Sequence, residues 1–136
     1  MHDGRISEAE TYDNGFNTPA EEWLPDGFND LLAVQAIFPL IAQFEMAGNL
    51  NENEVIGAVH DRIDYAWPII AERIRGIPEY RDLFVESFAS INEPSEISIV
   101  DVGNAIGAFV NQQWRSYDSP FDDFLNGNSS ALTERQ

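Results

Sequence analysis

Two polar side chains in a largely apolar part of the chain are the first candidates for chemistry. Glu45 lies between Phe44 and Met46, and an apolar setting of this kind raises the pKa of a carboxyl group. Such a carboxyl group is suited to general acid–base work. Gln35, ten residues earlier, carries an amide that can donate and accept hydrogen bonds. From spacing alone, the better explanation of the pair is structural: Glu45 as a partly exposed acid at a helix end and Gln35 as a polar residue capping the kink at Pro39.

The other reactive side chains form no recognisable site. The chain has no cysteine, which excludes a disulfide, a zinc–thiolate site and a thiol nucleophile within it. His2 and His60 are the only histidines, and neither belongs to a His-x-x-x-His or Glu-x-x-His pair. The sequence therefore predicts no metal site. It also has no Gly-x-Ser-x-Gly elbow and no Gly-rich phosphate loop.

The charge balance limits the partners. In 136 residues there are 24 acidic and 7 basic side chains, which gives a formal net charge of −17. Binding to nucleic acid or to an anionic membrane needs a basic stripe, and the sequence has none.

No run approaches the roughly 20 apolar residues of a membrane-spanning helix, and the start of the chain does not resemble a signal sequence. The length suits a single modest core.

The apolar pattern predicts an all-α fold made of short helices that prolines interrupt. Residues 1–26 lack periodicity and read as a long N-terminal loop, whereas residues 27–136 carry helical spacing. We treat residues 1–136 as one helical segment. No alternation of apolar and polar residues is long enough to predict a strand.

Local signals place the helix boundaries. Prolines are expected to end or kink one helix at Pro39, to interrupt another after Trp67, and to open one at Pro78. Capping patterns mark the starts of other helices. They are Asn51 with Glu54, Ser98 with Asp101, and Ser119 with Pro120 and the acids that follow.

Several motifs, in this order and spacing, resemble the bacterial di-haem cytochrome c peroxidase family, which includes MauG-like proteins. The resemblance is to the segment between the two haem domains and covers nearly the whole chain. The motifs are His2-Asp3-Gly4-Arg5, Gln35-Ala36, Pro39, Glu45-Met46, Ile77-Pro78-Glu79-Tyr80, Leu83-Phe84, Ser87-Phe88, Asn104 to Phe109, and Ser119 to Gly127.

The resemblance implies a role for the two polar side chains. In that family a Gln and a Glu, ten residues apart, lie on the distal side of the peroxidatic haem. Glu45 would then be the acid–base group that moves a proton as the O–O bond of peroxide breaks, and Gln35 would orient the peroxide or a water. We expect both to face one concavity lined by Phe38 and Phe44. The residues expected to contact haem are Phe38, Phe44, Met46 and His2.

The chain also departs from the family pattern. Members attach each haem through Cys-x-x-Cys-His, and this chain has no cysteine. Two c-type haems are therefore expected to be attached outside this chain, which reads as the interior of a longer protein and is expected to be inactive alone. His2 stands where well-studied members have a tryptophan thought to carry electrons between haems. Possible substitutes are Trp23, Trp67 and Trp114.

The resemblance thus implies that the chain is part of an oxidoreductase that reduces hydrogen peroxide with electrons from a small redox protein. The expected partners are the remainder of the haem protein and a small cytochrome c or cupredoxin, and the resemblance implies a periplasmic location. Two alternatives stay open. The chain could be a haem-free acidic interaction module, or one chain of a split enzyme.

Overall fold

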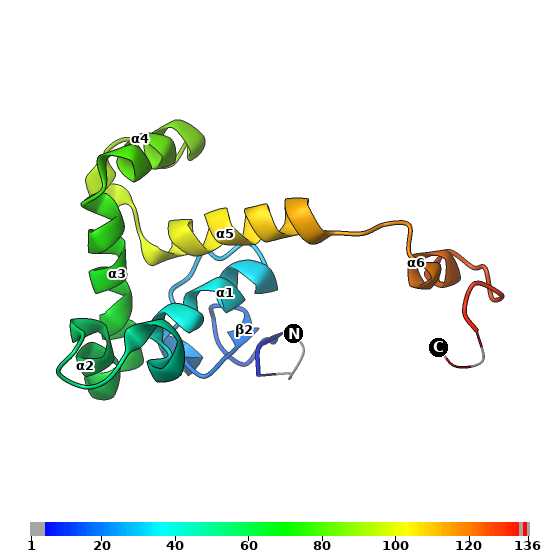
Figure 1. Cartoon of the computed structure of the whole chain (residues 1–136), viewed down its shortest axis with the longest axis horizontal. Coiled ribbons are helices and arrows are strands. Elements are labelled where there is room, and N and C mark those ends of the chain that lie inside the picture. Colours follow the sequence, from blue (N-terminus) through cyan, green and yellow to red (C-terminus); the bar gives the residue numbers. More distant parts are fainter. Residues whose placement is uncertain (1–4, 134, 136) are drawn as a thin grey trace.

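The computed structural model describes residues 5–133 and 135, and these are mostly helical (Figure 1). The predicted all-α class is confirmed. The α-helices are α1 (Leu31–Ile37), α2 (Glu54–Asp61), α3 (Ala66–Arg75), α4 (Pro78–Ser87), α5 (Ile99–Trp114) and α6 (Pro120–Leu125). Turns of 3-10 helix are η1 (Glu21–Trp23), η2 (Pro39–Ile41), η4 (Ile63–Tyr65) and η5 (Pro94–Glu96), and η3 (Gln43–Ala47) is π-helical.

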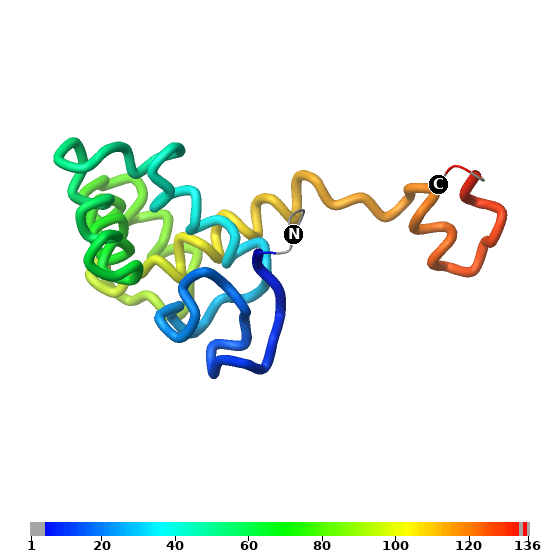
Figure 2. The backbone as a smooth tube through the Cα atoms, turned by 90° about the horizontal axis from the view of Figure 1, so that it is seen from below, coloured from blue at the N-terminus to red at the C-terminus, as the bar shows by residue number. Residues whose placement is uncertain are grey.

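The N-terminal loop contains a small hairpin that the sequence does not predict. Strand β1 (Ser7–Glu8) pairs antiparallel with β2 (Phe16–Asn17). Two residues per strand are too few to produce a visible alternation. The loop lies beside the helical body (Figure 2) and buries Ile6, Phe16 and Leu24 in the common core.

Most helix boundaries follow the expected signals. Pro78 opens α4, and the Ser98–Asp101 capping box opens α5. Asn51 does not cap α2, because its φ of 71° is left-handed whereas an N-cap needs extended backbone. Asn53 caps α2 instead by accepting a hydrogen bond from the Val55 N–H at 3.2 Å.

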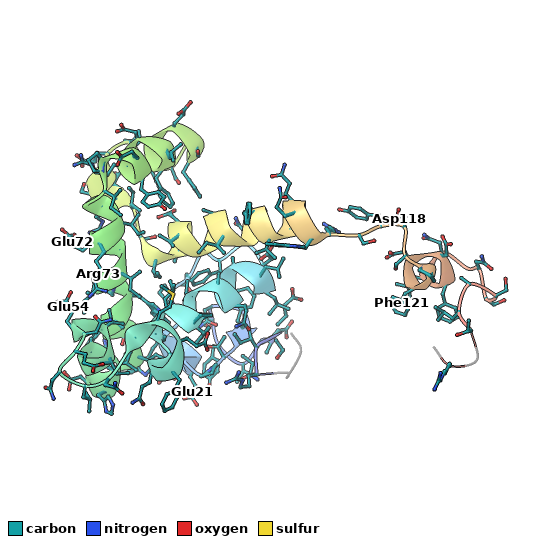
Figure 3. The ribbon with its side chains drawn as sticks, viewed as in Figure 1. Glu21, Glu54, Glu72, Arg73, Asp118 and Phe121 are labelled. Carbon is teal, nitrogen blue, oxygen red and sulfur yellow. The ribbon has the colours of Figure 1, made fainter. Side chains whose placement is uncertain are left out.

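The sequence predicts that Pro68 interrupts a helix after Trp67, and this prediction is wrong. Pro68 lies in the first turn of α3, which begins at Ala66, and the N–H groups of a first turn have no partner within the helix. The proline therefore costs α3 no hydrogen bond. Further along the chain, α3 is fastened to the start of α2, because Arg73 donates to Asn53 at 2.8 Å and to Glu54 at 3.1 Å (Figure 3).

The core is organised around the crossing of α1 and α5. A Cβ atom on Gly107 would lie 2.7 Å from the Ala33 nitrogen, and one on Gly103 would lie 2.8 Å from the Ala33 oxygen. Only glycine permits so close an approach of the two backbones. Asn104, between these glycines, donates to the Gly27 carbonyl at 3.0 Å and accepts from the Asn29 N–H at 2.9 Å.

A second part of the core lies where α3 meets η2. Trp67 is fully buried and packs edge-to-face on Phe38, with ring centroids 6.2 Å apart. The indole N–H of Trp67 has no hydrogen-bond partner in the described part of the chain. Packing rather than hydrogen bonding therefore holds this tryptophan in place.

Helix α6 stands apart from the body. Figures 1 and 2 show it at the end of an extended segment that follows α5. None of its residues belongs to the buried core, and Phe121, Phe124 and Leu125 are exposed. Among the described residues, no helix is long and apolar enough to cross a membrane.

The crossing of α1 and α5 predicts opposite effects for two glycine substitutions. Gly107→Ala should lower the free energy of unfolding by about 1–3 kcal/mol, because the added methyl group forces α1 and α5 apart. The control is Gly57→Ala in α2, where an added Cβ has no neighbour within 4 Å. It should raise the free energy of unfolding by about 0.5–1 kcal/mol through helix propensity. Urea denaturation measures the free energy of unfolding of both variants. Equal changes in the two variants would contradict the close approach of α1 and α5 at Gly107.

The cap of α6 predicts a pH dependence. The Ser119 hydroxyl (2.6 Å) and N–H (2.9 Å) donate to the Asp122 carboxylate and lower its pKa. Because the folded pKa lies below the unfolded one, the cap contributes fully above the unfolded pKa and is lost as pH falls through the folded pKa. NMR titration should show that Ser119→Ala returns the Asp122 pKa towards its usual value. Glu96, whose pKa is lowered by the Asn92 and Glu93 N–H groups, should not change.

Candidate distal wall

The chain between α1 and α2 is redirected at Pro39. Because proline has no N–H, the Gln35 carbonyl accepts instead from the Phe38 N–H at 3.3 Å, and α1 ends there. Pro39 then opens η2, and η3 follows after Ala42. The Gln35 carbonyl is thus satisfied within the same turn of the chain.

Two carbonyl groups, those of Ala42 and Gln43, hold the π-helical turn η3, and the Gln43 oxygen accepts from the Gly48 N–H at 3.1 Å. The Ala42 oxygen accepts from the N–H groups of Glu45, Met46 and Ala47 at 3.0–3.2 Å. Gly48 ends the turn with φ 73° and ψ −164°, a conformation that is essentially restricted to glycine. Short π-helical segments of this kind are frequent at functional sites.

The turn is held at its ends and open in its middle. Ile41 before it and Ala47 at its end are buried, whereas the four residues from Gln43 to Met46 are exposed. The Phe44 side chain is 93% exposed and that of Met46 63%. A hydrogen-bonded turn therefore presents Glu45 to the surroundings between two apolar side chains.

Gln35 and Glu45 lie on consecutive elements, α1 and η3, and η2 joins them. Gln35 is half-buried and Glu45 is exposed. Neither side chain has a hydrogen-bond or ion-pair partner among the residues that the structure describes. Both groups are therefore available to a ligand or to another surface.

The apolar enclosure expected around Glu45 is absent from the described chain. Phe38 packs against Trp67, whereas Phe44 projects outwards, so the two rings do not line one concavity with Gln35 and Glu45. The reason is that Pro39 and Ala42 turn the backbone between the two rings. His2, the remaining residue expected to contact haem, lies outside the described residues.

The three tryptophans lie in different settings. Trp67 is buried, Trp114 at the end of α5 is 70% exposed, and Trp23 lies at the surface. The Arg62 guanidinium stacks on Trp23, 3.9 Å from the ring centroid, and on Tyr65 at 4.2 Å. This stack joins the N-terminal loop to the helices, and no sequence pattern predicts it.

Asp64 holds the stacked Arg62 in place. Its two carboxylate oxygens accept from the Arg62 guanidinium at 2.5 and 2.8 Å, and these hydrogen bonds raise the pKa of Arg62. Arg62 therefore has a structural role, because its guanidinium binds Asp64 and stacks on two aromatic rings.

No group of three or more His, Asp or Glu residues in the described ranges is arranged to hold a metal ion.

Fold and site together define an all-α protein that presents an unpartnered carboxylate on a hydrogen-bonded π-helical turn. The family model described as di-haem cytochrome c peroxidase matches residues 2–130, and the chain belongs to this family. No curated protein and no solved structure matches the chain. The resemblance identified from the sequence motifs is thereby confirmed, and with it a di-haem peroxidase-like class of oxidoreductase.

The residues present fit one wall of a haem site. Without cysteine the chain cannot attach a c-type haem covalently. His60, the only histidine among the described residues, is exposed near the end of α2. Phe44 and Met46 are apolar, are exposed on the π-helical turn and flank an acid, which suits contact with a flat apolar group held by other polypeptide.

The exposure of the turn predicts that its apolar side chains do not stabilise the isolated chain. Phe44→Ser and Met46→Ser should each change the free energy of unfolding by less than about 0.5 kcal/mol. Phe38→Ala should cost about 2 kcal/mol or more, because Phe38 packs against buried Trp67. Thermal or urea unfolding measures all three. A loss at Phe44 as large as that at Phe38 would contradict an exposed turn.

Proposed function

We propose that this chain supplies the distal wall of the peroxide site in a di-haem cytochrome c peroxidase-like oxidoreductase. Glu45 is the acid–base group and Gln35 is the orienting group. The observation that carries the proposal is the turn η3, which fixes an unpartnered Glu45 between exposed Phe44 and Met46. Family membership supports the same function.

Glu45 performs the proton transfer in this proposal. Its carboxylate accepts a proton from one peroxide oxygen and returns it to the other oxygen, which leaves as water. The haem, when bound, supplies the iron that holds the peroxide and the electrons that reduce it. The carboxylate moves the proton between the two oxygens and is regenerated, so it is not consumed.

Gln35 positions the reactants. Its amide N–H can donate to a peroxide oxygen or a water, and its amide oxygen can accept in return. As a residue of the regular helix α1, Gln35 is held by backbone that packs on α5. A fixed neutral donor orients the substrate without competing for its proton.

Desolvation of Glu45 comes from outside the chain in this proposal. Phe44 and Met46 already border the carboxylate, and a second surface laid over them would exclude water from it. Exclusion of water raises the pKa of a carboxyl group and strengthens its interactions with the substrate. The surface that closes the site is the part of the haem protein that carries the haem.

The proposal extends to partners and location. The electron donor is a small cytochrome c or cupredoxin, and the complete protein works in the periplasm. A haem-free interaction module is a second candidate, because α5 and α6 carry exposed aromatic side chains. One chain of a split enzyme would use the same η3 turn and differ only in how the haem polypeptide is connected.

The test of Glu45 is a substitution in the haem-containing protein. Glu45→Gln keeps the size and hydrogen-bonding shape of the side chain but cannot carry a proton. It should lower peroxide turnover about 10²- to 10⁴-fold, with little change in the haem absorption spectrum. The matched control is Glu22→Gln on the exposed N-terminal loop, which should leave turnover unchanged. Normal turnover in Glu45→Gln would remove Glu45 from the mechanism.

A further inference from the structure

A buried side chain on α5 holds the segment that leads into α1. Asn104 is only 9% exposed. Its amide nitrogen donates to the Gly27 carbonyl at 3.0 Å, and its amide oxygen accepts from the Asn29 N–H at 2.9 Å. These partners lie 77 and 75 residues away along the chain. One side chain therefore fastens the start of the helical region to α5.

The two hydrogen bonds require a carboxamide. Residues 27–29 belong to no helix or strand. A carbonyl and the N–H two residues later are the two groups that one residue of a parallel strand would bind, so the Asn104 amide takes the place of such a residue. Aspartate lacks the donor, and alanine would leave both backbone groups without this partner.

The segment that Asn104 holds continues directly into α1. Asp30 follows Asn29 and caps α1 by accepting a hydrogen bond from the Ala33 N–H at 2.8 Å. Helix α1 has only seven residues, and so short a helix is not stable by propensity alone. Its position is therefore set by the contacts at its start and by its packing on α5.

Gln35 lies on the opposite side of α1 from the contact with α5. Ala33 is the residue that α5 approaches closely at Gly103 and Gly107, where the two helices run side by side (Figure 1). Two residues along a helix correspond to a rotation of about 200°, which places Gln35 on the far side of α1 from Ala33. A shift of α1 relative to α5 would therefore displace the Gln35 amide as well.

We propose that Asn104 is a positioning residue for Gln35. It fixes the start of α1 against α5 and thereby sets where the Gln35 amide lies. This inference rests on the proposed function for the role of Gln35, whereas the placement of α1 by Asn104 is a property of this chain. Turnover is sensitive to such a shift, because a misplacement of about 1 Å can lower it about 10²-fold.

Hydrogen exchange in the unaltered chain is the first test. The Asn29 N–H lies outside every helix and strand of the described residues, and Asn104 is the group that accepts its hydrogen bond. It should exchange with solvent about as slowly as the amides in the middle of α5. Exchange at the rate of an exposed loop amide would overturn the proposal.

Matched alanine variants of the full chain test the placement of α1. Asn104→Ala removes both hydrogen bonds to residues 27–29. The control is Asn53→Ala, which removes the cap of α2 and the bond from Arg73. Residual dipolar couplings should show α1 reoriented relative to α5 in the first variant only. Unchanged couplings would overturn the proposal. Asn104→Ser, which keeps a smaller polar group, replaces Asn104→Ala if that variant does not fold.

A double-mutant cycle in the haem-containing protein tests whether Asn104 acts through Gln35. Asn104→Ala should lower peroxide turnover about tenfold, and Gln35→Ala should lower it at least as much. In the Gln35→Ala background, Asn104→Ala should cause no further loss. Asn53→Ala should leave turnover unchanged. Equal losses from Asn104→Ala in both backgrounds would overturn the proposal.

The same cycle separates a failure of this inference from a failure of the proposed function. Unchanged turnover in Gln35→Ala would overturn the orienting role of Gln35, and with it any role of Asn104 in turnover, even if α1 is reoriented. A loss in Gln35→Ala with none in Asn104→Ala would overturn the role of Asn104 alone.

Discussion

The close approach of α1 to α5 is the constraint on which the other elements depend. Gly103 and Gly107 bring the two backbones together, and Asn104 between them fixes the segment that leads into α1. The direction of α1 then sets where η2 and η3 begin. A side chain at either glycine would therefore disturb the loop before α1 and the turn η3 that carries Glu45, although neither glycine lies near Glu45 in sequence.

Sequence patterns predicted those parts of the fold that short-range chemistry determines. The capping box at Ser98 and the proline at position 78 act within one helical turn, and both gave correct helix starts. Asn51 failed because a left-handed backbone overrode its capping tendency, and the hairpin at β1 and β2 was too short to produce a pattern. Contacts across the fold, such as Arg62 on Trp23, have no sequence signal at all.

The candidate site was only partly predictable for a related reason. Apolar neighbours in sequence suggested that Glu45 is enclosed, but on a π-helical turn the flanking Phe44 and Met46 point outwards. Sequence neighbours report local composition, whereas enclosure depends on distant elements or on another polypeptide. The family match fixes the class of protein, and the roles of Gln35 and Glu45 remain proposals that peroxide kinetics can test.

The separation of α6 from the body has a consequence for association. Residues 115–119 join α6, with Phe121 and Phe124, to the helical body, and no residue of α6 belongs to the buried core. A molecule that binds first to the helical body would meet α6 at an effective concentration in the millimolar range, because the two are joined by a short segment. Two weak contacts would then combine into binding of high avidity. Cleavage of the chain between α5 and α6 would abolish that gain.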